Sequence, residues 1–136
     1  MFDNTAWQEA RIQHDLGTYW GRLRYLADFI ETKPLSLVCM SRFHCGTAHC
    51  ALGWAETMPE FQALGIKSSY HVCGRDLIEV VEHNISIFGI TVSNKRYGYC
   101  FGYGAQFYYL GRLYTPADVA RHLRETADEL EVKGVR

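Results

Sequence analysis

The sequence predicts a mainly α-helical, single small domain of four to five helices, with a short two-stranded β element as an optional addition. Apolar side chains recur at three- and four-residue steps in several segments, and these segments carry recognisable helix starts and stops. The chain has 136 residues, of which 48% are hydrophobic. A chain of this length forms one domain that buries roughly two thirds of its unfolded surface. We expect this domain to span residues 1–136, with residues 1–4 and 131–136 frayed.

The first predicted helix is long, with Asn4 or Thr5 as its N-cap. It should end at Lys33–Pro34, because the residue before a proline avoids helical geometry. Gly17 and Gly21 each weaken it by about 1 kcal/mol relative to alanine, so a bend or a close contact is expected near Trp20. The buried stripe should consist of Leu16, Tyr19, Trp20, Leu23, Leu26, Ala27 and Ile30. The face toward water should consist of Arg22, Arg24, Asp28 and Glu31.

A second helix is predicted in and after the segment Cys45 to Ala55, CGTAHCALGWA. Thr47 precedes a run of good helix formers and is its predicted N-cap. Pro59 should end it. The apolar face should consist of Ala51, Trp54, Ala55 and Met58. Two short strands, Leu35 to Met40 and Ser69 to Cys73, could pair with each other.

A third helix should begin at Asp76, which has the spacing of a capping box with Glu79. Gly89 suits a left-handed C-terminal cap. The apolar stripe should consist of Leu77, Val80, Val81, Asn84, Ile85 and Phe88.

The last predicted helix has the clearest start. Thr115 is its N-cap, Pro116 occupies the first turn, and Asp118 faces the positive end of the helix dipole. The core face should consist of Val119, Leu123, Ala127 and Leu130. We recognise no linker, repeat or low-complexity tract along the chain.

Charge and termini limit the classes of function. The net charge is −1, so no overall positive field recruits nucleic acid or an acidic membrane. The start, MFDNTAWQEA, lacks the basic and apolar regions of a signal peptide. No stretch approaches eighteen consecutive apolar residues, so we expect no membrane span. Five cysteines without an export signal indicate reduced thiols and a cytoplasmic protein.

One interpretation of the segment Cys45 to Ala55 is nucleophilic catalysis. A cysteine at a helix N-terminus has a lowered pKa, which would make Cys45 a thiolate nucleophile. Its base would be His49, or a histidine from elsewhere in the fold such as His71 or His83. The other interpretation is structural, with Cys45 and Cys50 as small buried hydrophobes.

A metal site is the third interpretation. The plausible ligands are Cys39, His44, Cys45, His49, Cys50, His71 and Cys73. His71 and Cys73 lie two residues apart and would share one face of a strand. A zinc site made of Cys45, Cys50, His71 and Cys73 can be assembled from these residues, although the cysteine spacings are wider than in zinc knuckles. We expect no cofactor, with zinc as the alternative.

The stretch from Tyr97 to Tyr114 combines eight aromatic residues with four glycines, beside Lys95, Arg96 and Arg112. Aromatic and basic residues together can stack on nucleic-acid bases. The default interpretation is core packing, and any exposed part favours a protein partner over nucleic acid. The candidate binding residues are Lys95, Arg96, Tyr97, Tyr99, Tyr103, Tyr108 and Arg112.

The order of motifs resembles a family of small, largely uncharacterised bacterial and phage proteins with a Cys-Gly-Thr-x-x-Cys-x-x-Gly segment. The matching residues are Cys45, Gly46, Thr47, Cys50, Gly53, Pro59, Phe61, Gly65, Ile66, Phe88, Gly89, Ile90, Thr91, Cys100, Phe101, Thr115, Pro116, Val119 and Ala120. The resemblance spans about residues 22–128. The resemblance implies a cytoplasmic, mostly helical accessory protein encoded by a phage or mobile element, and it implies no activity.

These observations predict a non-enzymatic interaction protein that modulates a host factor through a protein partner. The alternatives are a thiol-dependent enzyme that uses Cys45 and a zinc-stabilised domain. The sequence determines neither the partner nor the oligomeric state.

Overall fold

The structure is a computed structural model that describes residues 14–34, 44–45, 48–69, 72–91, 93 and 115–135. Within these residues the elements are α2 (Tyr19–Glu31), β1 (His44–Cys45), β2 (Ala48–His49), α3 (Ala51–Glu56), α4 (Pro59–Ala63), α5 (Gly74–Ser86) and α8 (Pro116–Lys133). The prediction of a mainly α-helical domain is therefore confirmed.

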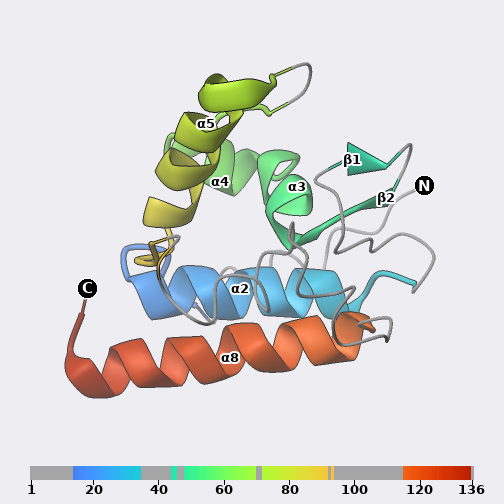
Figure 1. Cartoon of the computed structure of the whole chain (residues 1–136). Coiled ribbons are helices and arrows are strands. Elements are labelled where there is room, and N and C mark those ends of the chain that lie inside the picture. Colours follow the sequence, from blue (N-terminus) through green and yellow to red (C-terminus); the bar gives the residue numbers. More distant parts are fainter. Residues whose placement is uncertain are drawn as a thin grey trace.

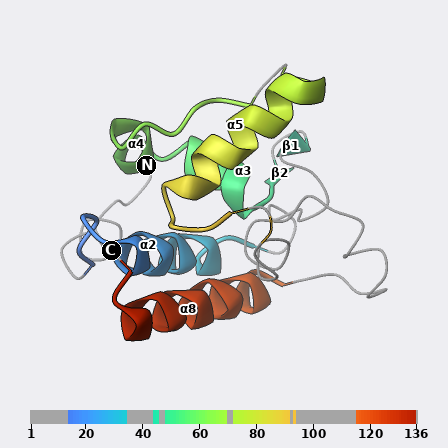
Figure 2. The same cartoon turned by 60° about the vertical axis from the view of Figure 1, so that its left-hand side comes forward.

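Helix α2 is the central element of the described part of the chain. Helix α8 lies antiparallel along one side of α2, and α3, α4 and α5 lie on its other side (Figure 1). The same arrangement is visible after rotation (Figure 2). Helices α2 and α8 are therefore adjacent in space although most of the chain separates them in sequence.

Helix α2 begins later than the sequence predicts. Residues 14–18 form turns, and Thr18 is the N-cap: its Oγ1 accepts a hydrogen bond from the Gly21 amide at 3.1 Å. A Cβ atom at Gly21 would lie 1.9 Å from the carbonyl oxygen of Asp15. The expected close contact beside Trp20 is thus present at Gly21. Asn4 and Thr5 lie outside the described residues, and the turn at 14–18 separates that region from α2.

The buried stripe of α2 is largely as predicted. Leu23, Leu26, Ala27 and Ile30 are completely buried. Tyr25, which the periodicity did not select, is also buried. Its ring makes an edge contact with Phe61 at 5.9 Å, and Phe61 makes another with Phe88 at 5.0 Å. Three rings therefore join α2 to α4 and to the residues that follow α5.

The helix at residues 51–56 is shorter than predicted. Ala48 and His49 belong to β2, so Thr47 does not cap α3; the N-cap is Cys50. Pro59 does not merely end this helix, since it is the first residue of α4. Its fixed φ and its missing N–H suit a first helical position.

The two-stranded element lies elsewhere than predicted. β1 and β2 pair antiparallel, with His44 opposite His49 and Cys45 opposite Ala48. Leu35 to Met40 lies outside the described residues. Of the second predicted strand, Ser69, Val72 and Cys73 are described, and they belong to no strand.

Helix α5 begins at Gly74, two residues before the predicted start, and Asp76 lies in its first turn. The N-cap Cys73 makes no side-chain capping hydrogen bond. At the other end Gly89 has φ of +76°, the left-handed conformation that the sequence predicts for it.

Helix α8 confirms its predicted start. The Thr115 Oγ1 accepts from the Asp118 amide, and the Asp118 Oδ2 accepts from the Thr115 amide, both at 3.1 Å. Residues 131–133, which are expected to fray, belong to α8. Gly134, with φ of +71°, ends the helix, and the Val135 amide donates to the Leu130 carbonyl. This left-handed cap stabilises the last turn.

Candidate functional site

Cys45, the candidate nucleophile, is in β1 and pairs with Ala48. Its predicted position at a helix N-terminus is therefore wrong. His49, the first candidate base, is in β2 opposite His44. The strand pairing places the backbones of these two histidines side by side.

Cys50 has a structural role. It is completely buried, and its Sγ accepts a hydrogen bond from the Gly53 amide at 3.3 Å. The thiol thus takes the place of the hydroxyl or carboxyl group that usually caps a helix. The interpretation of Cys50 as a packed thiol is confirmed.

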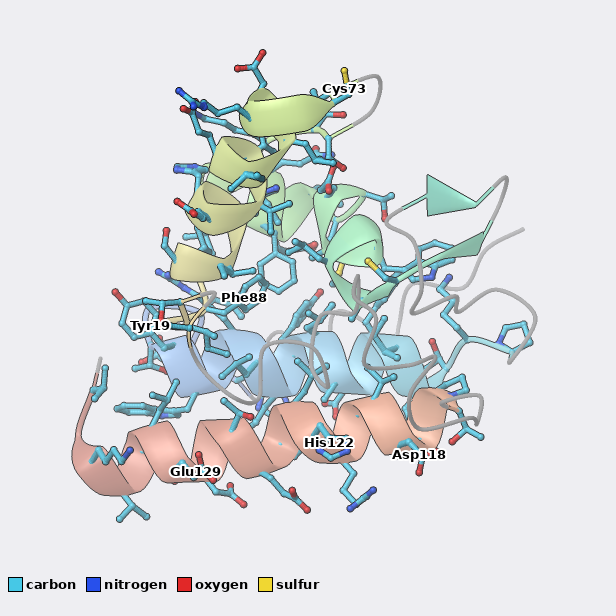
Figure 3. All side chains as sticks on the ribbon, in the orientation of Figure 1. Tyr19, Cys73, Phe88, Asp118, His122 and Glu129 are labelled. Carbon is cyan, nitrogen blue, oxygen red and sulfur yellow. The ribbon has the colours of Figure 1, made fainter. Side chains whose placement is uncertain are left out.

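Of the remaining candidates for catalysis or metal binding, Cys73 and His83 lie within the described residues. Cys73 is exposed at the outer end of α5 (Figure 3). His83 Nε2 lies 2.8 Å from the Gly65 carbonyl oxygen. His71 lies outside the described residues. Among the residues that are described, no three His, Cys, Asp or Glu side chains are grouped so that they could hold a metal ion.

The candidate binding residues Lys95, Arg96, Tyr97, Tyr99, Tyr103, Tyr108 and Arg112 all lie outside the described residues. The residues that flank this stretch are described. Ile90 is 1% exposed, and Thr115 forms the capping box of α8. Both ends of the stretch are therefore attached to the helical core.

Two groups of ion pairs join α2 and α8. Arg24 donates to Asp128 at 2.8 Å and to both carboxylate oxygens of Glu131 at 3.1 and 3.2 Å. Arg124 donates to Asp28 at 2.7 Å and to Glu31 at 2.6 Å. The polar face that was expected to point to water is therefore used in helix pairing.

This pairing reflects a short repeat in the sequence. Residues 23–31 and 123–131 both read Leu-Arg-x-x-Ala-Asp-x-x-Glu. Each arginine binds the aspartate and the glutamate of the other copy, and the middle of the two copies falls at Ala27 and Ala127, both completely buried. Helical periodicity gives no sign of this repeat, which is visible when the two helical segments are aligned with each other.

The two arginines stabilise the carboxylates that they bind. The hydrogen bond from Arg124 lowers the pKa of Glu31 below its ordinary value, while the hydrogen bond to Glu31 raises the pKa of Arg124. Arg24 has its pKa raised in the same way by Glu131 and Asp128. Each arginine is thus bound to two carboxylates of the opposite helix.

A buried carboxylate organises the chain after α4. Glu56, the last residue of α3, is 8% exposed. Its Oε1 accepts from the Ser69 amide at 2.5 Å, and its Oε2 accepts from the Ser69 hydroxyl at 2.7 Å. Two donors therefore compensate the cost of burying this side chain.

A buried amide holds the same segment from the other side. The Asn84 Oδ1 accepts from the Lys67 amide at 2.8 Å, and its Nδ2 donates to the Lys67 carbonyl at 2.9 Å. The Asn84 side chain on α5 thus pairs with both backbone polar groups of Lys67, as the backbone of a neighbouring β-strand would. Together, Glu56 and Asn84 hold residues 67–69 between α3 and α5.

An ammonium group lies against two aromatic rings where α2 meets α3. The Lys33 Nζ is 4.7 Å from the centroid of the Phe29 ring and 4.5 Å from that of the Trp54 ring. The two rings are 5.8 Å apart and tilted by 56°. Both distances are within the range of a cation–π interaction. Nothing in the sequence pattern indicates this cluster, because Lys33 and Pro34 together signal only a helix end.

Comparisons with protein families, with curated proteins and with solved structures find no match to this chain. Among the helices that are described, none combines the length and the apolar character that a membrane span requires.

Proposed function

We propose that this chain is a cytoplasmic, non-enzymatic interaction protein that binds a protein partner through its aromatic stretch. One observation supports a non-catalytic role above others. The five polar or charged side chains described as buried all make hydrogen bonds that hold the fold: Thr18, Glu56, Ser69, Asn84 and Thr126. Catalytic groups, in contrast, usually occupy sites where burial is not fully compensated by structural partners.

The described residues on either side of positions 92–114 also support the proposal. Before the stretch, Arg22 donates to the Ile87 carbonyl at 2.7 Å and ties the end of α5 to α2. After it, the capping box at Thr115 begins α8, which is paired with α2. A segment whose ends are held by a rigid frame loses less entropy when its side chains order on a partner.

The contact residues in this proposal are Lys95, Arg96, Tyr97, Tyr99, Tyr103, Tyr108 and Arg112. Tyrosine and arginine are enriched among the residues that contribute most to binding at protein interfaces. The resemblance to phage-encoded proteins extends the proposal to a bacterial host factor as the partner, so a bacterial lysate is the first source to test.

The experiment is affinity capture from that lysate with the wild-type chain and with a triple variant, Tyr99→Ala, Tyr103→Ala and Tyr108→Ala. We expect the wild type to retain one protein at a fixed stoichiometry and the variant to lose it, with the Tm of the two chains equal. The matched control is Arg121→Ala, an exposed change on α8, which should retain the partner. A variant that unfolds, or that still binds the partner, contradicts the proposal.

Thiol reactivity distinguishes the proposal from catalysis at Cys45. We expect iodoacetamide at neutral pH to alkylate Cys45 in the native protein no faster than it alkylates free cysteine. Alkylation of Cys45 many times faster than free cysteine would favour a thiol enzyme and overturn the non-enzymatic proposal. Peptide mapping by mass spectrometry separates Cys45 from the exposed Cys73.

A further inference from the structure

The cluster of Phe29, Trp54 and Lys33 has the composition of an ammonium-binding site. Two aromatic rings from different helices form its walls, and a cation lies within 4.7 Å of both ring centroids. Aromatic walls around a cation are the arrangement by which proteins recognise alkylated ammonium groups. In this chain the cation is the chain's own lysine.

Local hydrogen bonds hold both walls. The Thr32 hydroxyl donates to the Phe29 carbonyl at 2.7 Å, and the Thr57 hydroxyl donates to the Trp54 carbonyl at 2.7 Å. Each threonine caps the C-terminal end of the helix that carries the aromatic residue. The two rings therefore project from helix ends whose geometry is defined without the lysine.

The position of Lys33 adds a further attraction for a cation. Its amide donates to the Ile30 carbonyl at 3.0 Å, just beyond the C-cap of α2. The C-terminal end of a helix carries a partial negative charge, which favours positive groups. The site thus combines two aromatic faces with the negative end of a helix.

A primary ammonium is not the cation that such a site binds best. It is strongly hydrated, and it loses water when it lies against aromatic rings. Burial accordingly lowers the pKa of Lys33, which means that its charged form loses hydration in this position. A quaternary ammonium has no N–H donors and is weakly hydrated, so it loses less on entering the site.

We propose that the pair Phe29–Trp54 is a binding site for quaternary ammonium groups, and that Lys33 occupies it in the free protein and is displaced by the ligand. Lys33 then acts as an internal competitor, which reduces the apparent affinity by the fraction of time that it fills the site. The proposal does not depend on residues 95–112, so the two proposals can fail independently.

The test is an NMR titration with tetramethylammonium chloride that follows the indole N–H of Trp54, with sodium chloride at equal ionic strength as the reference. The Trp54 signal is assigned by its absence in Trp54→Leu. We expect Lys33→Met, which keeps the length of the stem and removes the charge, to bind about tenfold more tightly than the wild type. The matched control is Lys67→Met, an exposed lysine elsewhere, which should bind like the wild type.

Three results would overturn the proposal. Lys33→Met could bind no more tightly than the wild type, sodium chloride could shift the signal as much as tetramethylammonium does, or Phe29→Leu could leave the affinity unchanged. Because Lys33 is only partly buried, Lys33→Met carries the test even if Phe29→Leu fails to fold.

The source of the ligand is distinguished in a second titration of Lys33→Met. Choline represents a free small molecule, and a short peptide with a trimethyllysine represents a modified protein. Tighter binding of either one than of tetramethylammonium identifies the source and supports the site. If choline and the trimethyllysine peptide both bind more weakly than tetramethylammonium, the site does not accept a ligand larger than the quaternary ammonium head group. That result contradicts choline and trimethyllysine as sources of the ligand.

Discussion

Arg24 and Arg124 occupy equivalent positions in two antiparallel helices, and each binds an aspartate and a glutamate of the helix that carries the other. The two residues are a hundred positions apart in the sequence, yet each lies in the same nine-residue pattern. An antiparallel arrangement lets the same pattern satisfy both copies at once. The charges therefore define the register of α8 on α2.

Reversal of the charge at Arg124 should weaken this register. Arg124→Glu removes two ion pairs and brings a third carboxylate beside Asp28 and Glu31. We expect the free energy of unfolding to fall by about 1–2 kcal/mol, measured by urea denaturation at low salt. A second change, Glu31→Arg, should restore part of the loss by allowing the pair to form in the opposite sense.

The matched control for this prediction is Arg121→Glu on the same helix. Arg121 is exposed and pairs only within α8, with Asp118 and Glu125 at 3.8 and 3.7 Å. We expect a change within about 0.5 kcal/mol. Equal losses for Arg121→Glu and Arg124→Glu would mean that the pairs between helices contribute nothing specific.

The stability of the helix pair should depend on pH through Glu31. Its pKa is lower in the folded chain than its ordinary value of 4.5, because Arg124 donates to its carboxylate. A lowered folded pKa adds stability above pH 4.5, and that stability is lost as the pH falls through the folded pKa. We expect the wild type to exceed Glu31→Gln in stability at neutral pH, and the difference to shrink as the pH falls below 4.5.

This pH dependence is measured by thermal denaturation of both chains across the acidic range. Glu82→Gln, at an exposed position of α5, is the control and should differ little from the wild type at any pH. A difference between Glu31→Gln and the wild type that stays constant from neutral to acidic pH would show that ionisation of Glu31 is not its source.

Gly89 should tolerate no side chain. Its φ of +76° disfavours other residues, and a Cβ atom there would lie 2.7 Å from Cγ and Cδ2 of the Tyr19 ring. Figure 3 shows Tyr19 close to Phe88, where α2 meets the end of α5. Gly89→Ala combines a left-handed backbone with overpacking, so we expect a loss of about 2–4 kcal/mol in chemical denaturation.

Gly134 separates these two contributions. Its φ is +71°, and a Cβ atom there would meet nothing within 4 Å. Gly134→Ala should therefore cost only the backbone term, about 1 kcal/mol. If both alanine variants lose the same stability, the contact between Gly89 and Tyr19 is not a constraint.

Glu56 should contribute more to the stability of the fold than an exposed carboxylate does. Glu56→Ala leaves the amide and the hydroxyl of Ser69 without these acceptors in a buried position, and we expect a loss of about 2 kcal/mol. Ser69→Ala removes one of the two hydrogen bonds and should cost about 1 kcal/mol. Urea denaturation of both variants measures the difference, and a larger loss for Ser69→Ala than for Glu56→Ala would contradict this role.

Residues near in sequence were predicted well where one local signal sufficed. Thr115, Pro116 and Asp118 begin α8 as expected, because a capping box needs only a hydroxyl and a carboxylate three residues apart. Gly89 has the expected left-handed conformation because glycine, without a Cβ atom, adopts a positive φ at little cost at a helix end. The stripe of α2 at Leu23, Leu26, Ala27 and Ile30 follows from helical periodicity alone.

The candidate site could not be predicted in the same way. Thr47 had the correct residue type for a cap, but pairing of β2 with β1 delays the helix until Cys50. The position of Cys45 depends on that strand pairing, and no local sequence signal predicts the pairing. The cluster of Phe29, Trp54 and Lys33 joins residues of α2 and α3 that share no periodic pattern.

By itself, the sequence determined the helical class of this protein, the buried stripe of α2, the start of α8 and the left-handed glycine after α5, since these depend on neighbours within four residues. Only the tertiary structure decided that Arg24 and Arg124 bind across α2 and α8, that Glu56 and Asn84 hold residues 67–69, and that Lys33 lies on two aromatic rings. These contacts arise when separate elements pack, and the energy that selects them belongs to pairs of residues distant in the chain.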